Sequence, residues 1–128
     1  MTLQRTPLYL ECLQAGGRMV PFAGWEMPVQ YTSLTEEHNA VRTKVGMFDI
    51  SHMGIIRITG TNAKQDFQEL IPSDIYKIGA GEAFYTVMLN KEGGILDDLI
   101  VYDLGRNNRD EECLLLIINA ACAEKDLQ

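Results

Sequence analysis

The sequence has few of the residues that build disulfide frameworks or zinc sites. It contains three cysteines, Cys12, Cys113 and Cys122, without a CxxC pair, and two histidines, His38 and His52. The odd number of cysteines argues against a complete disulfide framework, and the spacing matches no zinc-ligand pattern. We therefore expect reduced thiols in a reducing compartment and no metal ion.

Long apolar runs and basic clusters are also missing. No run reaches the ~18 apolar residues that suggest a membrane-spanning helix, and the start, MTLQRTPLYLECLQAGG, lacks the apolar core of a signal peptide and the Arg and Ser of a transit peptide. Acidic residues outnumber basic ones by 18 to 11, for a net charge of −7. Such a chain is a poor ligand for a phosphate backbone. We expect a cytoplasmic protein that binds neither membrane nor nucleic acid.

The composition that remains is that of an ordinary globular chain. Of its 128 residues, 46% are hydrophobic and 23% are charged, which excludes a fibrous or disordered protein. Apolar runs and turn residues predict a series of short elements. They are a helix from Thr6-Pro7 to Gly16, a strand and loop over 19–28, a helix over 34–44, a strand over 55–59, a helix after a Thr61-Asn62 cap, strands over 83–90, 95–102 and 113–119, and the start of a helix over 120–128.

The order of these elements predicts the fold class. From residue 53 it is strand, helix, strand, strand, strand, helix, and the short loops between the later strands make antiparallel neighbours. This favours an α+β fold of antiparallel sheets with flanking helices over a doubly wound sheet. The first 52 residues hold too few elements to close a core alone, so we expect a piece of a larger protein.

The most informative segment is FYTVMLNKEGGILDDLIVY, residues 84–102. Two apolar runs flank a loop over 91–94, which predicts a hairpin. Side chains alternate along a strand, so Asp97 and Asp98 must point to opposite faces. Both faces are otherwise apolar, and we expect both to be covered.

The predicted register brings a polar and aromatic patch together. If Asn90 pairs with Ile95, Tyr85 lies opposite Ile100, Val87 lies opposite Asp98, and Tyr102 shares their face. Two phenols, an aliphatic floor and one acid suit a flat heterocycle with polar edges. The alternative is that both aspartates only bound the hairpin and lie in solvent, as acidic residues near turns often do.

Two other segments are weaker candidates. Asp49, Ser51 and His52 are the residue types of a catalytic triad, but they lie too close in sequence to assume its geometry. We expect the local backbone to satisfy His52. Gly79 and Gly81 lack the third glycine and the helix of a dinucleotide-binding motif, so a loop is expected there.

Five segments of the chain form a recognisable set: RTPLY (5–9), PFAGWEMPVQY (21–31), EEHNAVRTKVGMFDISHMG (36–54), GGILDDLIVY (93–102) and INAACAEKD (118–126). The most specific motifs within them are GMFD-x-SHMG and GG-x-x-DDL-x-VY. Together, from about Arg5 to Asp126, they resemble the N-terminal part of aminomethyltransferase, the T-protein of the glycine cleavage system.

The resemblance implies a reaction and a set of site residues. The family moves the one-carbon unit of the aminomethyl group on the lipoyl arm of H-protein to tetrahydrofolate, giving methylenetetrahydrofolate, ammonia and dihydrolipoyl H-protein. Asp98 matches the catalytic aspartate, held to raise the nucleophilicity of folate nitrogen N10. Arg57 stands where the family usually has an aliphatic residue, and we leave it out of the site. The positions that match the folate pocket are Met53, Tyr85, Ile100, Tyr102 and Asn119.

The resemblance also implies a larger architecture. The family has three domains around a folate-binding hole, and this chain would be about its first third. Residues 1–52 would be the N-terminal segment of a discontinuous first domain, and residues 53–128 the first segment of a ferredoxin-like second domain. The 128 residues alone are then expected to be inactive. The alternatives are a noncatalytic folate-binding or protein-interaction module, or another folate-dependent one-carbon enzyme.

Overall fold

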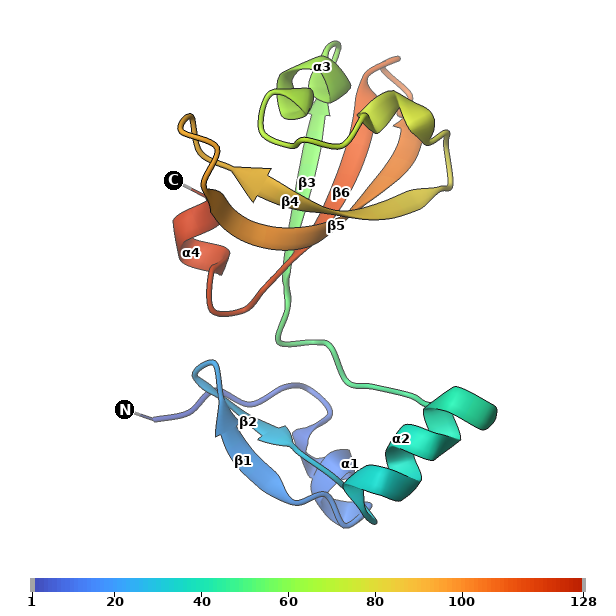
Figure 1. The fold of residues 1–128 in the computed structure, drawn as a ribbon, viewed down its shortest axis with the longest axis vertical. Coiled ribbons are helices and arrows are strands. Elements are labelled where there is room, and N and C mark those ends of the chain that lie inside the picture. Colours follow the sequence, from blue (N-terminus) through green and yellow to red (C-terminus); the bar gives the residue numbers. More distant parts are fainter. Residues whose placement is uncertain (1, 128) are drawn as a thin grey trace. The chain divides into compact units, whose positions relative to one another are not determined.

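The computed structural model describes residues 2–127. They fall into two compact units that divide between His52 and Met53, and each unit is described by itself (Figure 1). The α+β class with antiparallel sheets is confirmed. Within the described range, every helix is too short or too polar to cross a membrane.

The first unit contains a hairpin where a single strand and a loop were expected. Ala23 and Gly24 both have positive φ, 49° and 83°, and this two-residue turn suits the twist of paired strands. It brings Phe22 opposite Trp25. The prediction missed the second strand because nothing but Gly24 marked the turn. The elements of this unit are α1 (Tyr9–Gln14), β1 (Met19–Phe22), β2 (Trp25–Pro28) and α2 (Leu34–Thr43).

Helix α2 begins where its capping residue predicts. The Ser33 hydroxyl accepts a hydrogen bond from the Glu36 N–H at 3.2 Å, which satisfies one of the free donors of the first turn. Glu36 and Glu37 lie in that turn, where negative charge opposes the positive end of the helix dipole.

The second unit is a four-stranded antiparallel sheet in the order β3-β6-β5-β4, with short helices (Figure 1). Gly79 and Gly81 lie in the loop before β4, as expected, and not at the start of a helix. The elements are β3 (Gly54–Gly60), α3 (Ala63–Gln68), the 3₁₀ turn η1 (Ile75–Lys77), β4 (Ala83–Leu89), β5 (Ile95–Arg106), β6 (Glu112–Ile118) and α4 (Ala123–Asp126).

The start of α3 differs from the prediction. The Asn62 side chain makes no capping hydrogen bond. The Glu112 carboxylate, from β6, accepts the Lys64 N–H at 2.9 Å instead. A carboxylate at this end of a helix satisfies a free donor and opposes the dipole, so the cap comes from a distant strand.

One face of the sheet holds the core. Phe67 and Ile71, from α3 and the segment after it, pack with Ile75 of η1 against this face. The opposite face is open, because Tyr102 and Leu104 on β5 are 37% and 42% exposed. The expectation that both faces of β5 are covered is therefore wrong for the described residues. The strand residues that complete the core are Met88, Leu99, Val101, Leu114, Leu116 and Ile118.

Two leucines of β5 test this one-sided burial. Leu99 is 1% exposed and Leu104 is 42% exposed. Leu99→Ala leaves a cavity in the core, and we expect the free energy of unfolding to fall by about 2–5 kcal/mol. Leu104→Ala removes the same atoms from the open face and should cost about 1 kcal/mol or less. Urea denaturation of both variants measures the difference, and equal losses would contradict the assignment of faces.

Candidate functional site

The candidate site lies on the hairpin formed by β4 and β5. The predicted pairs are confirmed: Tyr85 lies opposite Ile100 and Val87 lies opposite Asp98. Because directly opposite residues share a face of the sheet, Tyr85, Asp98, Ile100 and Tyr102 lie on one side. This is the open side.

The register changes nearer the tip of the hairpin. A bulge between Met88 and Leu89 places Leu89 opposite Ile95, so the expected pairing of Asn90 with Ile95 is wrong. Asn90 belongs to the turn, where its Oδ1 accepts the Gly94 N–H at 2.7 Å. The backbone N–H of Asn90 donates to the Gly94 carbonyl at 2.9 Å. An Asn side chain that bonds nearby backbone groups in this way favours turn over strand.

The two aspartates occupy different environments, and neither is fully in solvent. Asp97 is 5% exposed and points to the core side, whereas Asp98 is half-buried on the open side. The prediction of opposite faces is confirmed, and the alternative that both lie in solvent is wrong.

Asp98 is held by donors from the two neighbouring strands. The Tyr85 hydroxyl donates to its Oδ2. The Asn119 side-chain nitrogen donates to its Oδ1 at 3.1 Å and to its carbonyl at 3.0 Å. The hydrogen bond to Asp98 raises the pKa of the Tyr85 phenol, with a smaller contribution from burial. A carboxylate oriented in this way on an open face can accept a proton from a bound group.

The remaining predicted residues lie around this carboxylate. Asn119 directly follows β6, and Met53 directly precedes β3. Because Gly54 pairs with Ile118, Met53 and Asn119 lie at the same end of neighbouring strands. Arg57 lies in the same row as Tyr102, since Leu115 pairs with both, and it is exposed. The strands therefore bring Tyr85, Asp98, Ile100 and Tyr102 to one face, with Arg57 in the same row as Tyr102. Met53 and Asn119 lie at one end of the sheet.

Asp97 has a hydrogen-bond network that the sequence did not reveal. Its Oδ2 accepts the Asn119 backbone N–H at 3.0 Å, and its Oδ1 accepts the Asn119 side-chain N–H at 2.9 Å. Burial favours a higher pKa for Asp97, but these hydrogen bonds outweigh it and lower the pKa. Asn119 thus bonds both aspartates.

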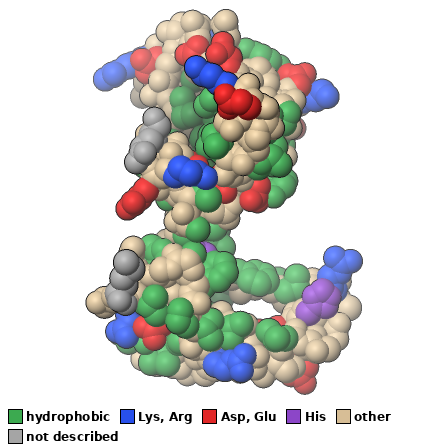
Figure 2. Space-filling view, turned by 60° about the vertical axis from the view of Figure 1, so that its left-hand side comes forward, with side chains coloured by type: hydrophobic (Ala, Val, Ile, Leu, Met, Phe, Trp, Pro, Cys, Tyr) green, Lys and Arg blue, Asp and Glu red, His purple; other side chains and the backbone are tan. Residues whose placement is uncertain are grey.

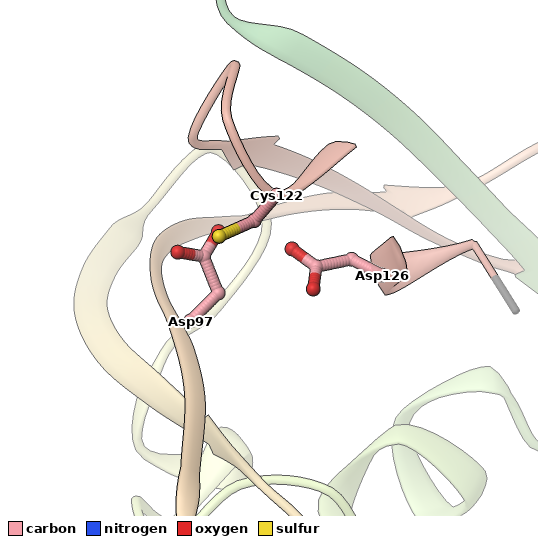
Figure 3. Close-up of side chains that lie close together, drawn as sticks. All are labelled: Asp97, Cys122 and Asp126. Carbon is pink, nitrogen blue, oxygen red and sulfur yellow. The ribbon is translucent and has the colours of Figure 1, made fainter. Parts of the chain in front are cut away.

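Two further polar side chains lie against Asp97 (Figure 3). Cys122 and Asp126 each place a ligand-type atom within 4.8 Å of it and of one another. The Asp126 side chain is fully buried, and neither of its oxygens has a hydrogen-bond partner among the described residues. Burial raises the pKa of Asp126, and Asp97 raises it further.

Two carboxylates and a thiol are chemically able to hold a divalent cation. Burial and the neighbouring Asp97 also raise the pKa of the Cys122 thiol. Protonated forms of Cys122 and Asp126 are therefore favoured. We interpret Asp97 and Asp126 as a carboxyl pair in which Asp126 carries the proton.

The first unit does not contain a triad. Asp49 accepts the Thr6 hydroxyl at 2.6 Å and the Ser51 N–H at 2.9 Å, so Thr6 does not cap α1 as expected. These bonds lower the pKa of Asp49 against the opposing effect of burial. The His52 Nδ1 is buried without a hydrogen-bond partner among the described residues, and the expectation that the local backbone satisfies His52 is wrong for this atom.

The sequence and the fold can now be compared with known proteins. The chain matches the family described as "GCVT N-terminal domain" over residues 8–128. It belongs to this family.

Two curated relatives that match the chain are aminomethyltransferases. It is 64% identical over 126 residues to an aminomethyltransferase of Prochlorococcus marinus (strain MIT 9303), covering 98% of this chain and 34% of the relative. It is 64% identical to an aminomethyltransferase of Parasynechococcus marenigrum (strain WH8102), with the same coverage. The fold is similar to the crystal structure of glycine cleavage system aminomethyltransferase T from Bartonella henselae, with a TM-score of 0.84 and 37% identity, over 97% of this chain and 33% of that one. The chain thus spans about a third of the length of these relatives.

Asp126→Asn tests the carboxyl pair. A raised pKa in the fold means that stability falls as pH rises from the ordinary Asp value, ~3.9, through the raised one. An amide at this position is neutral at any pH. We expect the variant to gain stability relative to the parent, by about 1 kcal/mol, as pH rises from about 4 to 7.

Urea midpoints across this pH range provide the measurement. The titratable neighbours of residue 126 are the same in both proteins: Asp97, Cys122 and Lys125, whose ammonium lies 3.8 Å from Asp126 and 3.7 Å from the Cys122 sulfur. Asp110→Asn is the control, because the Asp110 side chain is 88% exposed. A difference that does not depend on pH would contradict the raised pKa of Asp126.

Proposed function

We propose that this chain forms the first part of an aminomethyltransferase of glycine cleavage. The reaction takes the aminomethyl group on the lipoyl arm of H-protein and gives its methylene carbon to tetrahydrofolate. Two bonds form between the carbon and two folate nitrogens, while the bonds from the carbon to the amino nitrogen and to the lipoyl sulfur break. The two protons lost by the folate nitrogens pass to the departing ammonia and to the lipoyl thiol. The products are methylenetetrahydrofolate, ammonia and dihydrolipoyl H-protein.

The observation that carries this proposal is the placement of Asp98. It lies half-buried on the open face, between the Tyr85 hydroxyl and the Asn119 amide. The folate nitrogen must lose its proton as it attacks, and a fixed carboxylate beside it accepts that proton or stabilises the charge that develops. Asp98 is the catalytic residue of the proposal.

The same face supplies a platform for tetrahydrofolate as the acceptor substrate. Tyr85 is 65% exposed and can stack on a planar ring. Ile100 beside it is aliphatic and half-buried, and Tyr102 adds a second phenol. Mixed aromatic and aliphatic surface with a few polar groups is typical of sites for flat ligands. We assign folate binding to Met53, Tyr85, Ile100, Tyr102 and Asn119.

The proposal includes the larger architecture and the setting. Residues 1–52 would be the N-terminal segment of a discontinuous first domain, and residues 53–128 the first segment of a ferredoxin-like second domain, in a three-domain folate-binding fold. Two observations support it: the chain spans about a third of its relatives, and the second unit leaves large hydrophobic side chains such as Tyr85 and Leu104 exposed. Figure 2 shows hydrophobic side chains at the surface of this unit. Lipoylated H-protein would be the partner. The three free cysteines are consistent with a cytoplasmic location.

Asp98→Asn in the full-length protein tests the proposed catalytic role. The change keeps the shape of the side chain and removes its charge and its ability to take a proton. We expect the chemical step to slow by roughly 10²–10⁴-fold. Tetrahydrofolate affinity should change much less, because the aromatic and aliphatic platform remains. Single-turnover ammonia release and calorimetry measure the two quantities.

The control comes from another aspartate of β5. Asp103 is 3% exposed and its Oδ2 lies 2.6 Å from the Lys64 ammonium. Asp103→Asn breaks a buried ion pair, so it reports general destabilisation. Folded Asp103→Asn should turn over within a few-fold of the parent. An unchanged rate in Asp98→Asn would overturn the proposal.

A further inference from the structure

Asp97 and Asp98 point to opposite faces of β5, yet both accept hydrogen bonds from Asn119. We propose that Asp97 is a positioning residue for Asp98 that acts through the Asn119 side chain. This inference rests on the proposed function for its catalytic meaning, and on the described contacts for its geometry.

Asp97 fixes Asn119 by two hydrogen bonds. The backbone N–H of Asn119 goes to one carboxylate oxygen at 3.0 Å, and its side-chain N–H goes to the other at 2.9 Å. Asp97 is 5% exposed, so water does not compete freely for these bonds. The buried carboxylate of Asp97 thereby fixes the position of both the backbone and the side chain of Asn119.

The chemistry of the acceptors also sets which way the amide faces. An ionised carboxylate only accepts hydrogen bonds, and only the nitrogen of an Asn side chain donates them. The Asn119 nitrogen must therefore face Asp97. From there it reaches the Asp98 carbonyl at 3.0 Å and its Oδ1 at 3.1 Å.

Two further side chains lie against Asp97: Cys122 and the buried Asp126 (Figure 3). Both are favoured in protonated form, as described above, and a protonated thiol or carboxyl can donate to Asp97. The neighbouring Lys125 donates from its ammonium to the Leu96 carbonyl at 2.8 Å.

Loss of Asp97 should thus be transmitted to Asp98 in one step. Asp97→Asn leaves one acceptor oxygen where Asn119 needs two. The Asn119 amide is then free to rotate, and Asp98 loses its donor from β6. A displacement of about 1 Å at a reacting group can cost roughly 100-fold in rate.

The first measurement needs no substrate. In full-length protein labelled with ¹⁵N-asparagine, the Asn119 side-chain protons should exchange slowly with water. Asp97→Asn should accelerate this exchange by at least tenfold, whereas Asp98→Asn should leave it within about threefold, because Asp97 still holds the amide. Asp103→Asn serves as the matched buried control and should leave it unchanged. Asp97→Ala is the stronger variant, and if it does not fold Asp97→Asn decides.

The second measurement is kinetic. We expect Asp97→Asn to lower kcat roughly 10- to 100-fold, and to raise the KM for tetrahydrofolate by less than kcat falls. Asp97→Asn combined with Asn119→Ala should be no slower than the slower single variant, because the two residues act along one path. If the losses of kcat in the two single variants add up in the double variant, Asp97 does not act through Asn119.

The two measurements separate this inference from the proposed function. Unchanged amide exchange in folded Asp97→Asn overturns the positioning role, whatever reaction the protein catalyses. Accelerated exchange in a protein whose parent transfers no aminomethyl group would confirm the geometry and overturn the proposed function. Accelerated exchange with an unchanged kcat would overturn the positioning role.

Discussion

Side chains alternate along β5, so the adjacent carboxylates of Asp97 and Asp98 lie on opposite faces of the sheet. Asp97 enters the core side and Asp98 stays on the open side. A buried carboxylate is strongly disfavoured unless donors surround it, whereas a half-buried one keeps some solvent. Asn119, Cys122 and Asp126 lie around the buried Asp97, which requires hydrogen-bond donors. Tyr85 and Tyr102 lie on the open face, where a ligand can approach Asp98.

A second buried carboxylate, Asp103, lies further along β5 and also requires polar partners. Asp103 faces the Lys64 ammonium at 2.6 Å, and its Oδ1 accepts the Gly105 N–H at 2.8 Å. Removing one partner of such a buried pair typically costs about 3–5 kcal/mol. Among the described residues no cation is bonded to Asp97, which instead depends on hydrogen bonds from Asn119. On β5, Asp103 therefore holds α3 against the sheet through Lys64, and Asp97 holds Asn119 beside the candidate site.

Local patterns predicted the parts of the structure that depend on neighbours in sequence. Alternation along β5 gave the opposite faces of Asp97 and Asp98, and the hairpin placed Tyr85 across from Ile100. The role of Asp97 could not be found this way, because Asn119 is 22 residues away and reaches it only through the pairing of β5 with β6. Glu112 as the cap of α3 is a contact of the same kind. The assignment of Asp98 to chemistry came from family motifs, since an acid beside a turn has no such meaning alone.

The bulge between Met88 and Leu89 separates the tip of the hairpin from the candidate site. Strand pairing has a period of two, so a one-residue slip would turn Tyr85 away from Asp98. The bulge absorbs such a mismatch locally, and the turn from Asn90 closes on its own hydrogen bonds. A change in the number of residues at the tip therefore need not shift the strand pairing at the candidate site. Evolution can vary the length of this loop, and a protein engineer can graft onto it, while the distance between phenol and carboxylate stays fixed.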